Sequence, residues 1–137
     1  MKWVMGEKTE KQKVGNLGEG IACRFLERKG FVISQRNYRK PWGEIDIISE
    51  KKAVRHFIEV KTVSRESLEN ISREMDSYRP EDNIHPWKLK RLSRAIQSYL
   101  LEHEISEEGK WQFDVVTVFL DERGKKAKVE LMEDIVL

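Results

Sequence analysis

The chain has 137 residues, of which 39% are hydrophobic and 36% are charged, which excludes a disordered or fibrous protein. This length suits one domain, so we expect residues 1–137 to form a single unit in which core and functional site share the same layers. Lysine and arginine outnumber aspartate and glutamate by only 26 to 24, so the net charge of +2 does not by itself argue for a polyanionic partner.

The amino-terminal segment predicts neither secretion nor a membrane span. Residues 1–10 carry early charges and contain no long apolar stretch. The single cysteine, Cys23, excludes an internal disulfide, and its apolar neighbours favour a buried thiol over a nucleophile. We therefore expect a cytoplasmic protein that does not contact a membrane.

Residues 9–29 are predicted to form the first helix. Apolar side chains recur there at steps of three and four residues, at Val14, Leu17, Ile21, Phe25 and Leu26. Gly30 is expected to end the helix, because glycine accepts the left-handed backbone of a C-terminal cap. Residues 31–36 then read as the first strand.

Two further strands are predicted at 43–49 and 54–63, joined by the polar turn of residues 50–52. Strand alternation is expected to put Glu44, Asp46 and Ile48 on one face of the first, opposite Ile45 and Ile47. In the second strand, it is expected to put Phe57, Glu59 and Lys61 on one face, opposite Ile58, Val60 and Thr62. Each strand thus carries acid on one face.

The second half of the chain predicts a helix followed by two strands. Residues 86–104 align Lys88, Leu92, Ala95 and Tyr99 on one helical stripe, and Pro86 suits the first turn. Residues 111–120 are strongly apolar and are predicted to form a strand, and residues 127–132 are predicted to form the last strand after a turn. The expected class is therefore α/β, with a mixed central sheet flanked by helices in the order αβββαβ plus a C-terminal strand.

Asp46 and Glu59 are the candidate metal ligands. A charge within an apolar strand is costly unless it is paired or bound to metal. If the two acidic strands form a hairpin, both carboxylates come close together, and a hard ion such as Mg²⁺ or Mn²⁺ would balance them, with the Val60 carbonyl as a further ligand. Lys61, two residues after Glu59, would orient the attacking water or stabilise charge on phosphorus. The pattern predicts phosphodiester hydrolysis.

A simpler interpretation of the same residues is that they are exposed charges paired across the sheet. An acid among isoleucines, followed one hairpin later by Glu-x-Lys, is a more specific coincidence, and we favour the catalytic interpretation. Glu44 could add a ligand or lie at the rim of the site.

These motifs resemble the PD-(D/E)xK nuclease superfamily and, within it, the YraN-type family, which is similar to the archaeal Holliday junction resolvases. The resemblance rests on Gly18-Glu19, Arg36-Asn37-Tyr38, Gly43-Glu44-Ile45-Asp46, Phe57-Ile58-Glu59-Val60-Lys61-Thr62 and Phe113-Asp114-Val115-Val116. It implies a restriction-endonuclease-like core and nuclease ancestry. It also implies that Glu19 reaches toward the metal site as a catalytic residue; the alternative is a solvated helix acid.

Basic residues on both sides of the acidic strands are candidate nucleic-acid contacts. They are Arg36, Arg39 and Lys40 before the acidic strand, and Lys88 and Arg91 on the second helix. Lys88 could instead be a structural lysine, and the others ordinary solvated charges. His56, His85 and His103 show no zinc-ligand spacing with one another or with Cys23, so no chemistry is assigned to them.

The leading hypothesis is a Mg²⁺- or Mn²⁺-dependent endonuclease acting on DNA, with branched or structured DNA among the candidate substrates. The alternative is a non-catalytic nucleic-acid-binding module, or an RNA-directed relative, that retains the nuclease fold. A homodimer is a further expectation, since symmetric pairing would let two copies cut two strands.

Overall fold

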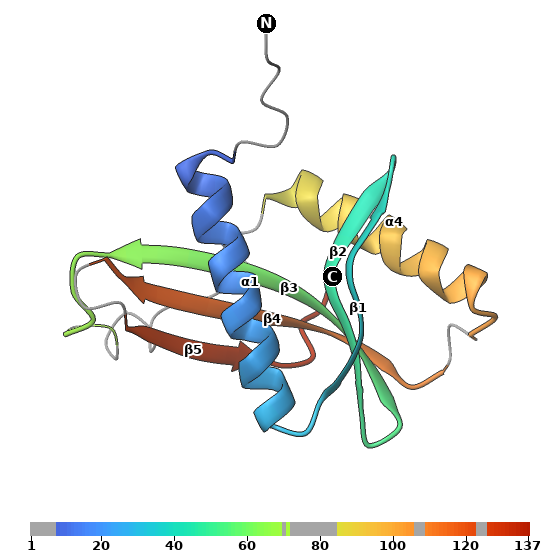
Figure 1. Cartoon of the computed structure of the whole chain (residues 1–137). Coiled ribbons are helices and arrows are strands. Elements are labelled where there is room, and N and C mark those ends of the chain that lie inside the picture. The colour runs from blue at the N-terminus through green and yellow to red at the C-terminus, as the bar shows by residue number, and fades with distance from the viewer. Residues whose placement is uncertain (1–7, 70, 72–84, 106–108, 123–125) are drawn as a thin grey trace, which may run out of the picture.

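A five-stranded sheet in the order β1–β2–β3–β4–β5 forms the centre of the molecule (Figure 1). The computed structural model describes residues 8–69, 71, 85–105, 109–122 and 126–137. The elements are α1 (Glu10–Arg28), β1 (Val32–Lys40), β2 (Gly43–Lys51), β3 (Val54–Arg65), α4 (Pro86–Glu102), β4 (Trp111–Asp121) and β5 (Ala127–Met132). The predicted order of helices and strands is confirmed.

The sheet is mixed, as predicted. β1, β2 and β3 pair antiparallel as consecutive hairpins, β3 and β4 pair parallel, and β5 returns antiparallel beside β4. A parallel pair needs a long crossover, and α4 lies within the segment that connects β3 to β4. This α/β architecture is consistent with a restriction-endonuclease-like core.

The ends of α1 follow local sequence chemistry. Thr9 and Gln12 form a capping box, in which the Gln12 N–H donates to Thr9 Oγ1 at 3.1 Å and the Thr9 N–H donates to Gln12 Oε1 at 2.9 Å. At the other end, Gly30 has a φ of +92° and donates its N–H to the Glu27 carbonyl. The glycine therefore ends the helix as predicted.

Helix α4 begins at Pro86, and His85 caps it. The His85 side chain accepts a hydrogen bond from the Trp87 N–H at 3.1 Å, and Pro86 has no N–H that would need a partner. The helix ends at Glu102, two residues before the predicted end. In the part of the chain that the structure describes, no helix is both long enough and apolar enough to cross a membrane.

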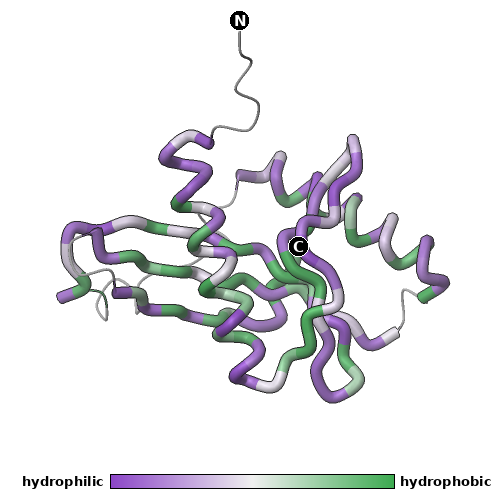
Figure 2. The backbone as a smooth tube through the Cα atoms, viewed as in Figure 1, coloured by the Kyte–Doolittle hydropathy of each residue, from purple (hydrophilic) through white to green (hydrophobic). Residues whose placement is uncertain are grey.

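The sheet buries a separate hydrophobic cluster on each face. The cluster against α4 includes Tyr38, Ile45, Ile48, Phe57, Leu92, Ala95, Tyr99 and Phe113. The cluster against α1 includes Ala22, Cys23, Leu26, Phe31, Ile47, Ile58, Val116 and Val118. Figure 2 shows hydrophobic residues along the middle of the sheet and hydrophilic residues on the first turns of α1.

The prediction that Ile45 and Ile47 share a face is wrong, because they belong to opposite clusters. Arg36 lies opposite Ile47 and Tyr38 lies opposite Ile45. Asn37 and Asp46 lie between these two pairs, at the point where the side chains of β2 stop alternating regularly between the two faces of the sheet. Asn37 has a φ of +53°, a conformation that asparagine tolerates better than most residues. The same bend lets β1 continue to Lys40 rather than end at the predicted residue 36.

The tip of the β1–β2 hairpin is fixed to α4 by close packing and ion pairs. A Cβ added at Gly43 would lie 1.9 Å from the Arg91 carbonyl oxygen, so only glycine fits there. Arg91 donates to Glu44 at 2.7 Å and to the Pro41 carbonyl at 3.3 Å. These contacts set the position of the strand segment that carries Asp46.

A buried polar network joins β3, β4 and the C-terminal segment. His56 Nδ1 lies 2.6 Å from Asp114 Oδ2, while Asp114 Oδ1 accepts hydrogen bonds from Gln112 Nε2 at 2.9 Å and the Asp134 N–H at 3.0 Å. Asp114 is fully buried, and these partners satisfy both of its oxygens. His56, to which the sequence assigned no chemistry, thus has a structural partner.

Two glycines of α1 provide a matched test of how closely α1 packs on β3. A Cβ added at Gly18 would lie 2.0 Å from Thr62 Oγ1, whereas a Cβ at Gly15 would meet nothing within 4 Å. We expect Gly15→Ala to raise the free energy of unfolding by up to about 1 kcal/mol through helix propensity. We expect Gly18→Ala to lower it by about 2 kcal/mol, because the β-branched Thr62 cannot move aside easily.

Urea denaturation of both variants measures the difference. The double variant Gly18→Ala with Thr62→Ala should recover part of the loss, because it removes the two closest atoms, Thr62 Oγ1 and Cγ2, and leaves only Cβ at 2.9 Å. Equal stability changes for the two single variants would contradict the close contact.

Candidate functional site

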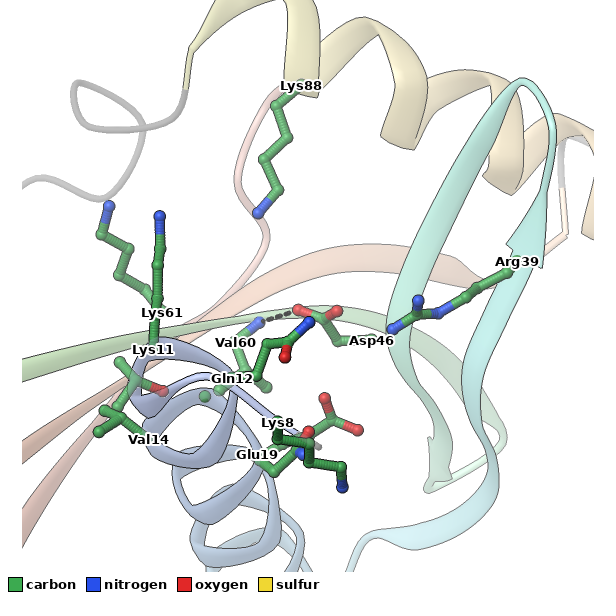
Figure 3. A pocket seen from close by; sticks show the side chains of 13 residues that line it. Lys8, Lys11, Gln12, Val14, Glu19, Arg39, Asp46, Val60, Lys61 and Lys88 are labelled. Atoms are coloured by element: carbon green, nitrogen blue, oxygen red, sulfur yellow. Dashed lines mark hydrogen bonds between the residues drawn. The ribbon is translucent and has the colours of Figure 1, made fainter. Parts of the chain in front are cut away.

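An open pocket of about 670 Å³ lies where the first half of α1, the hairpin strands and the start of α4 meet (Figure 3). Its described lining is strongly charged. The cationic side chains are Lys8, Lys11, Arg39, Lys61 and Lys88, and the acidic ones are Glu19 and Asp46. Such a lining favours a polyanion with a cation-binding point beneath it.

Asp46 lies in this pocket, at the point where β2 and β3 begin to separate. The recorded pairing of the two strands runs from Lys51 opposite Val54 to Ile47 opposite Ile58. One residue further, the Asp46 carboxylate accepts the Val60 N–H at 2.8 Å (Figure 3). The hairpin bend therefore holds the carboxylate at the edge of the sheet.

Glu59 is the buried acid of the site, with only 3% of its surface exposed. Burial raises its pKa to about 8; the neighbouring Asp46 charge and a hydrogen bond with Asp46 add to this effect, while Lys88 opposes it. Asp46 and Glu59 thus lie close enough for each charge to act on the other. Two carboxylates this close favour a proton or a cation between them.

Lys88 reaches Glu59 from the opposite wall of the pocket. It extends from the first turn of α4 (Figure 3). Its ammonium forms an ion pair with the Glu59 carboxylate. Burial lowers the pKa of Lys88, but the Glu59 carboxylate more than offsets this, so the pKa is raised overall. Lys88 thus lines the pocket and has a structural partner there, while its predicted contact with nucleic acid stays a prediction.

Lys61 lines the pocket two residues after Glu59. In Figure 3 its amino group lies on the far side of the pocket from Arg39 and is directed away from the Asp46 carboxylate. The side chain is half-buried. A role for Lys61 at the reacting phosphate therefore requires its flexible stem to turn inward.

Glu19 also lies in the pocket and is not a solvated helix acid. Its side chain is 12% exposed and pairs with Arg36 at 3.2 Å. Burial raises the pKa of Glu19, the Asp46 charge raises it further, and Arg36 lowers it. The influence of Asp46 means that Glu19 lies near the same acidic centre.

The predicted nucleic-acid contacts fall into two groups. Arg39 and Lys88 line the pocket, and Arg39 extends toward Asp46 in Figure 3. Arg36, Lys40 and Arg91 are instead engaged with acids of the chain, Arg36 with Glu19, Lys40 with Glu102 at 3.0 Å, and Arg91 with Glu44. Glu44 therefore supports the hairpin rather than the acidic centre.

Sequence analysis missed Lys8 and Lys11, which line the pocket from the start of α1. Part of the signal was present, since Lys11 recurs with Gly15 and Glu19 at helical steps of four on a polar stripe, whereas Lys8 precedes the N-cap Thr9. It was overlooked because the stripe is polar, whereas the helix was recognised from its apolar stripe.

The donor set at Asp46 and Glu59 fits a hard divalent cation. Both side chains offer carboxylate oxygens, the donors that Mg²⁺ and Mn²⁺ prefer. Val60 lines the pocket beside them, and its N–H is used by Asp46; metal binding by its carbonyl stays a prediction. Among the described residues, the one tight group of three possible ligands is elsewhere: His56, Asp114 and Glu133 have ligand atoms within 4.8 Å of one another.

The comparisons with known proteins agree on one family. Residues 18–118 match the family model described as uncharacterised protein family UPF0102. The chain is 37% identical over 123 residues to a UPF0102 protein of Helicobacter hepaticus, covering 90% of this chain and 94% of that protein. It is 32% identical over 114 residues to a UPF0102 protein of Dictyoglomus thermophilum, covering 83% and 88%. The matched region contains the whole acidic hairpin, and the chain belongs to the UPF0102 family.

Proposed function

We propose that this protein is a metal-dependent nuclease that hydrolyses phosphodiester bonds in DNA. The observation that carries the proposal is that Asp46 lies in a pocket whose other charged side chains are mostly cationic and interacts with the buried Glu59 of the neighbouring strand. An anionic backbone would be drawn to the lysines and arginine, while the paired acids would hold a cation at the point of reaction.

The ligands of Mg²⁺ or Mn²⁺ would be Asp46, Glu59 and the Val60 carbonyl, with Glu19 nearby. When bound, the ion would act as a Lewis acid and lower the pKa of water. The bend at Asn37 and the Val60 N–H orient Asp46 for this task. The surrounding apolar clusters hold Glu59 in a fixed position, which favours strong coordination once its proton is lost.

The cationic side chains would have two roles at the phosphates of the substrate. Lys61 would turn toward the scissile group and stabilise charge that develops on its oxygens. Arg39, Lys8 and Lys11 would hold the flanking backbone, because they line the pocket mouth from two different elements. Recognition of branched or structured DNA, a homodimer and a cytoplasmic location remain parts of this proposal.

Cleavage of labelled branched, single-stranded and linear DNA with Mg²⁺ or Mn²⁺ tests the proposal. The wild type should cut at least one substrate, and removal of the metal by a chelator should stop it. Lys61→Met should slow cleavage by about a hundredfold or more, since its ammonium stabilises transition-state charge. Lys52→Met, in the exposed β2–β3 turn, is the matched control and should leave the rate unchanged.

A wild type that binds DNA but cuts none of these substrates, nor the matching RNA, would overturn the nuclease proposal. The same protein would then be a binding module. Sedimentation of the protein with and without DNA tests the homodimer separately.

A further inference from the structure

Lys88 holds an unusual position among the cations of the pocket. Its side chain is 48% exposed, yet its ammonium pairs with a Glu59 carboxylate whose side chain is only 4% exposed. The lysine comes from α4 and the glutamate from β3, so the pair joins two different elements. A half-exposed lysine thus pairs with a buried acid.

The acid pair needs a positive charge, and within the described residues Lys88 supplies it. Asp46 already uses its carboxylate to accept the Val60 N–H, and Glu19 is paired with Arg36. A divalent ion that binds between Asp46 and Glu59 would lie close to the Lys88 ammonium, which already contacts Glu59 Oε1. The ammonium and the ion cannot share that position at contact distance, because like charges repel strongly where water is excluded.

A lysine side chain can leave its partner carboxylate more easily than an arginine that is held by two groups. Its ammonium is a point charge on a flexible stem, and Lys88 makes its ion pair with one carboxylate oxygen. Arg91, one helical turn further along α4, is instead held by two different groups, Glu44 and the Pro41 carbonyl. Arg91 is therefore fixed, whereas Lys88 can turn away from Glu59 while its stem stays in the pocket.

We propose that Lys88 is an internal counter-ion that leaves Glu59 when a divalent metal binds and then contacts a phosphate of the nucleic acid. This inference rests on the proposed metal site. Its consequence is a coupling between two ligands: metal binding releases a cation for phosphate, and phosphate binding holds that cation away from Glu59. By linkage, each ligand then tightens the other by the same factor.

Calorimetric titration with Mn²⁺ in mildly alkaline buffer, without nucleic acid, tests the competition directly. Lys88→Met keeps the length of the stem and removes the charge, and it should bind Mn²⁺ about tenfold more tightly than the wild type. Lys90→Met is the matched control, because this exposed lysine on the same helix has the same charge; its effect should be small. Asp46→Asn should lose most of the binding in either background.

A second experiment tests whether the released Lys88 contacts phosphate. It measures the binding of a short labelled DNA strand with and without Mn²⁺, and it checks that the strand stays uncut. Mn²⁺ should strengthen DNA binding by the wild type and by Lys90→Met to a similar degree. The strengthening should be several-fold smaller for Lys88→Met, because no lysine is released.

The outcomes distinguish a failure of the Lys88 exchange from a failure of the proposed metal site. If the wild type binds no Mn²⁺, or Asp46→Asn binds it as well as the wild type, the metal site itself is wrong. If Asp46→Asn abolishes Mn²⁺ binding but Lys88→Met matches the wild type in both measurements, the site stands and the exchange of Lys88 is wrong.

Discussion

Replacing Asp46 with asparagine should reduce metal-dependent cleavage by about a thousandfold or more while leaving the fold intact, because a neutral ligand loses most of its attraction for a divalent ion. The fold should survive because the amide oxygen introduced by Asp46→Asn can still accept the Val60 N–H that the carboxylate accepts at 2.8 Å. Cleavage is measured under single-turnover conditions on the substrate the wild type prefers, and the fold by thermal unfolding.

Glu50→Gln is the matched control for Asp46→Asn. Glu50 lies on the same strand and also carries an ion pair, but its side chain is 51% exposed and its partner is Arg55. We expect full activity from this variant. If Asp46→Asn kept a rate within tenfold of the wild type, Asp46 would not be a metal ligand, and the pocket would have to act through other residues.

Replacing Glu59 with glutamine should stabilise the protein in alkaline solution, which is unusual for a change at a candidate catalytic residue. The pKa of Glu59 is about 8 in the folded protein, mainly because of burial, against an ordinary value of 4.5. Between these values the folded state holds a proton that the unfolded chain has lost. The free energy of unfolding therefore falls as pH rises through this window.

Glutamine has no such proton to lose. Below pH 4.5, Glu59→Gln and the wild type should have similar stability, because both side chains are then neutral in both states. Above the folded-state pKa, the variant should be more stable by about 5 kcal/mol. Urea denaturation across the pH range measures this difference, and Glu50→Gln again serves as control. A constant difference at all pH values would show that Glu59 titrates normally, and Mn²⁺ should reduce the difference by stabilising the ionised wild type.

The fold was predictable from the sequence where local periodicity decides it. The helical spacing of α1 and α4, the glycine after α1 and the alternation along β3 depend on neighbours in the chain, and these elements appear in the predicted order. Alternation failed at Ile45 and Ile47. The hairpin turns over there because its tip packs on α4, some 50 residues away, which no local pattern reveals.

Some residues of the candidate site were likewise predictable from the sequence, and others were not. Asp46 and Glu59 were predictable because acids in apolar strands are costly, and antiparallel pairing then brings them together. The sequence did not predict the acidic partners of three basic residues, Arg36, Lys40 and Arg91, because each ion pair joins segments that are distant in the chain. The group of His56, Asp114 and Glu133 was hidden for the same reason, because its members come from three separate segments.

Helices α1 and α4 both begin at the pocket. The first turn of α1 supplies Lys11 and Gln12 to its wall, and the first turn of α4 supplies Lys88. A helix carries about half a positive elementary charge at its N-terminus from the alignment of its peptide dipoles. A phosphate bound in this pocket, as proposed, would be attracted by the backbone as well as by the side chains, and substituting the lysines one at a time would leave this part of the attraction in place.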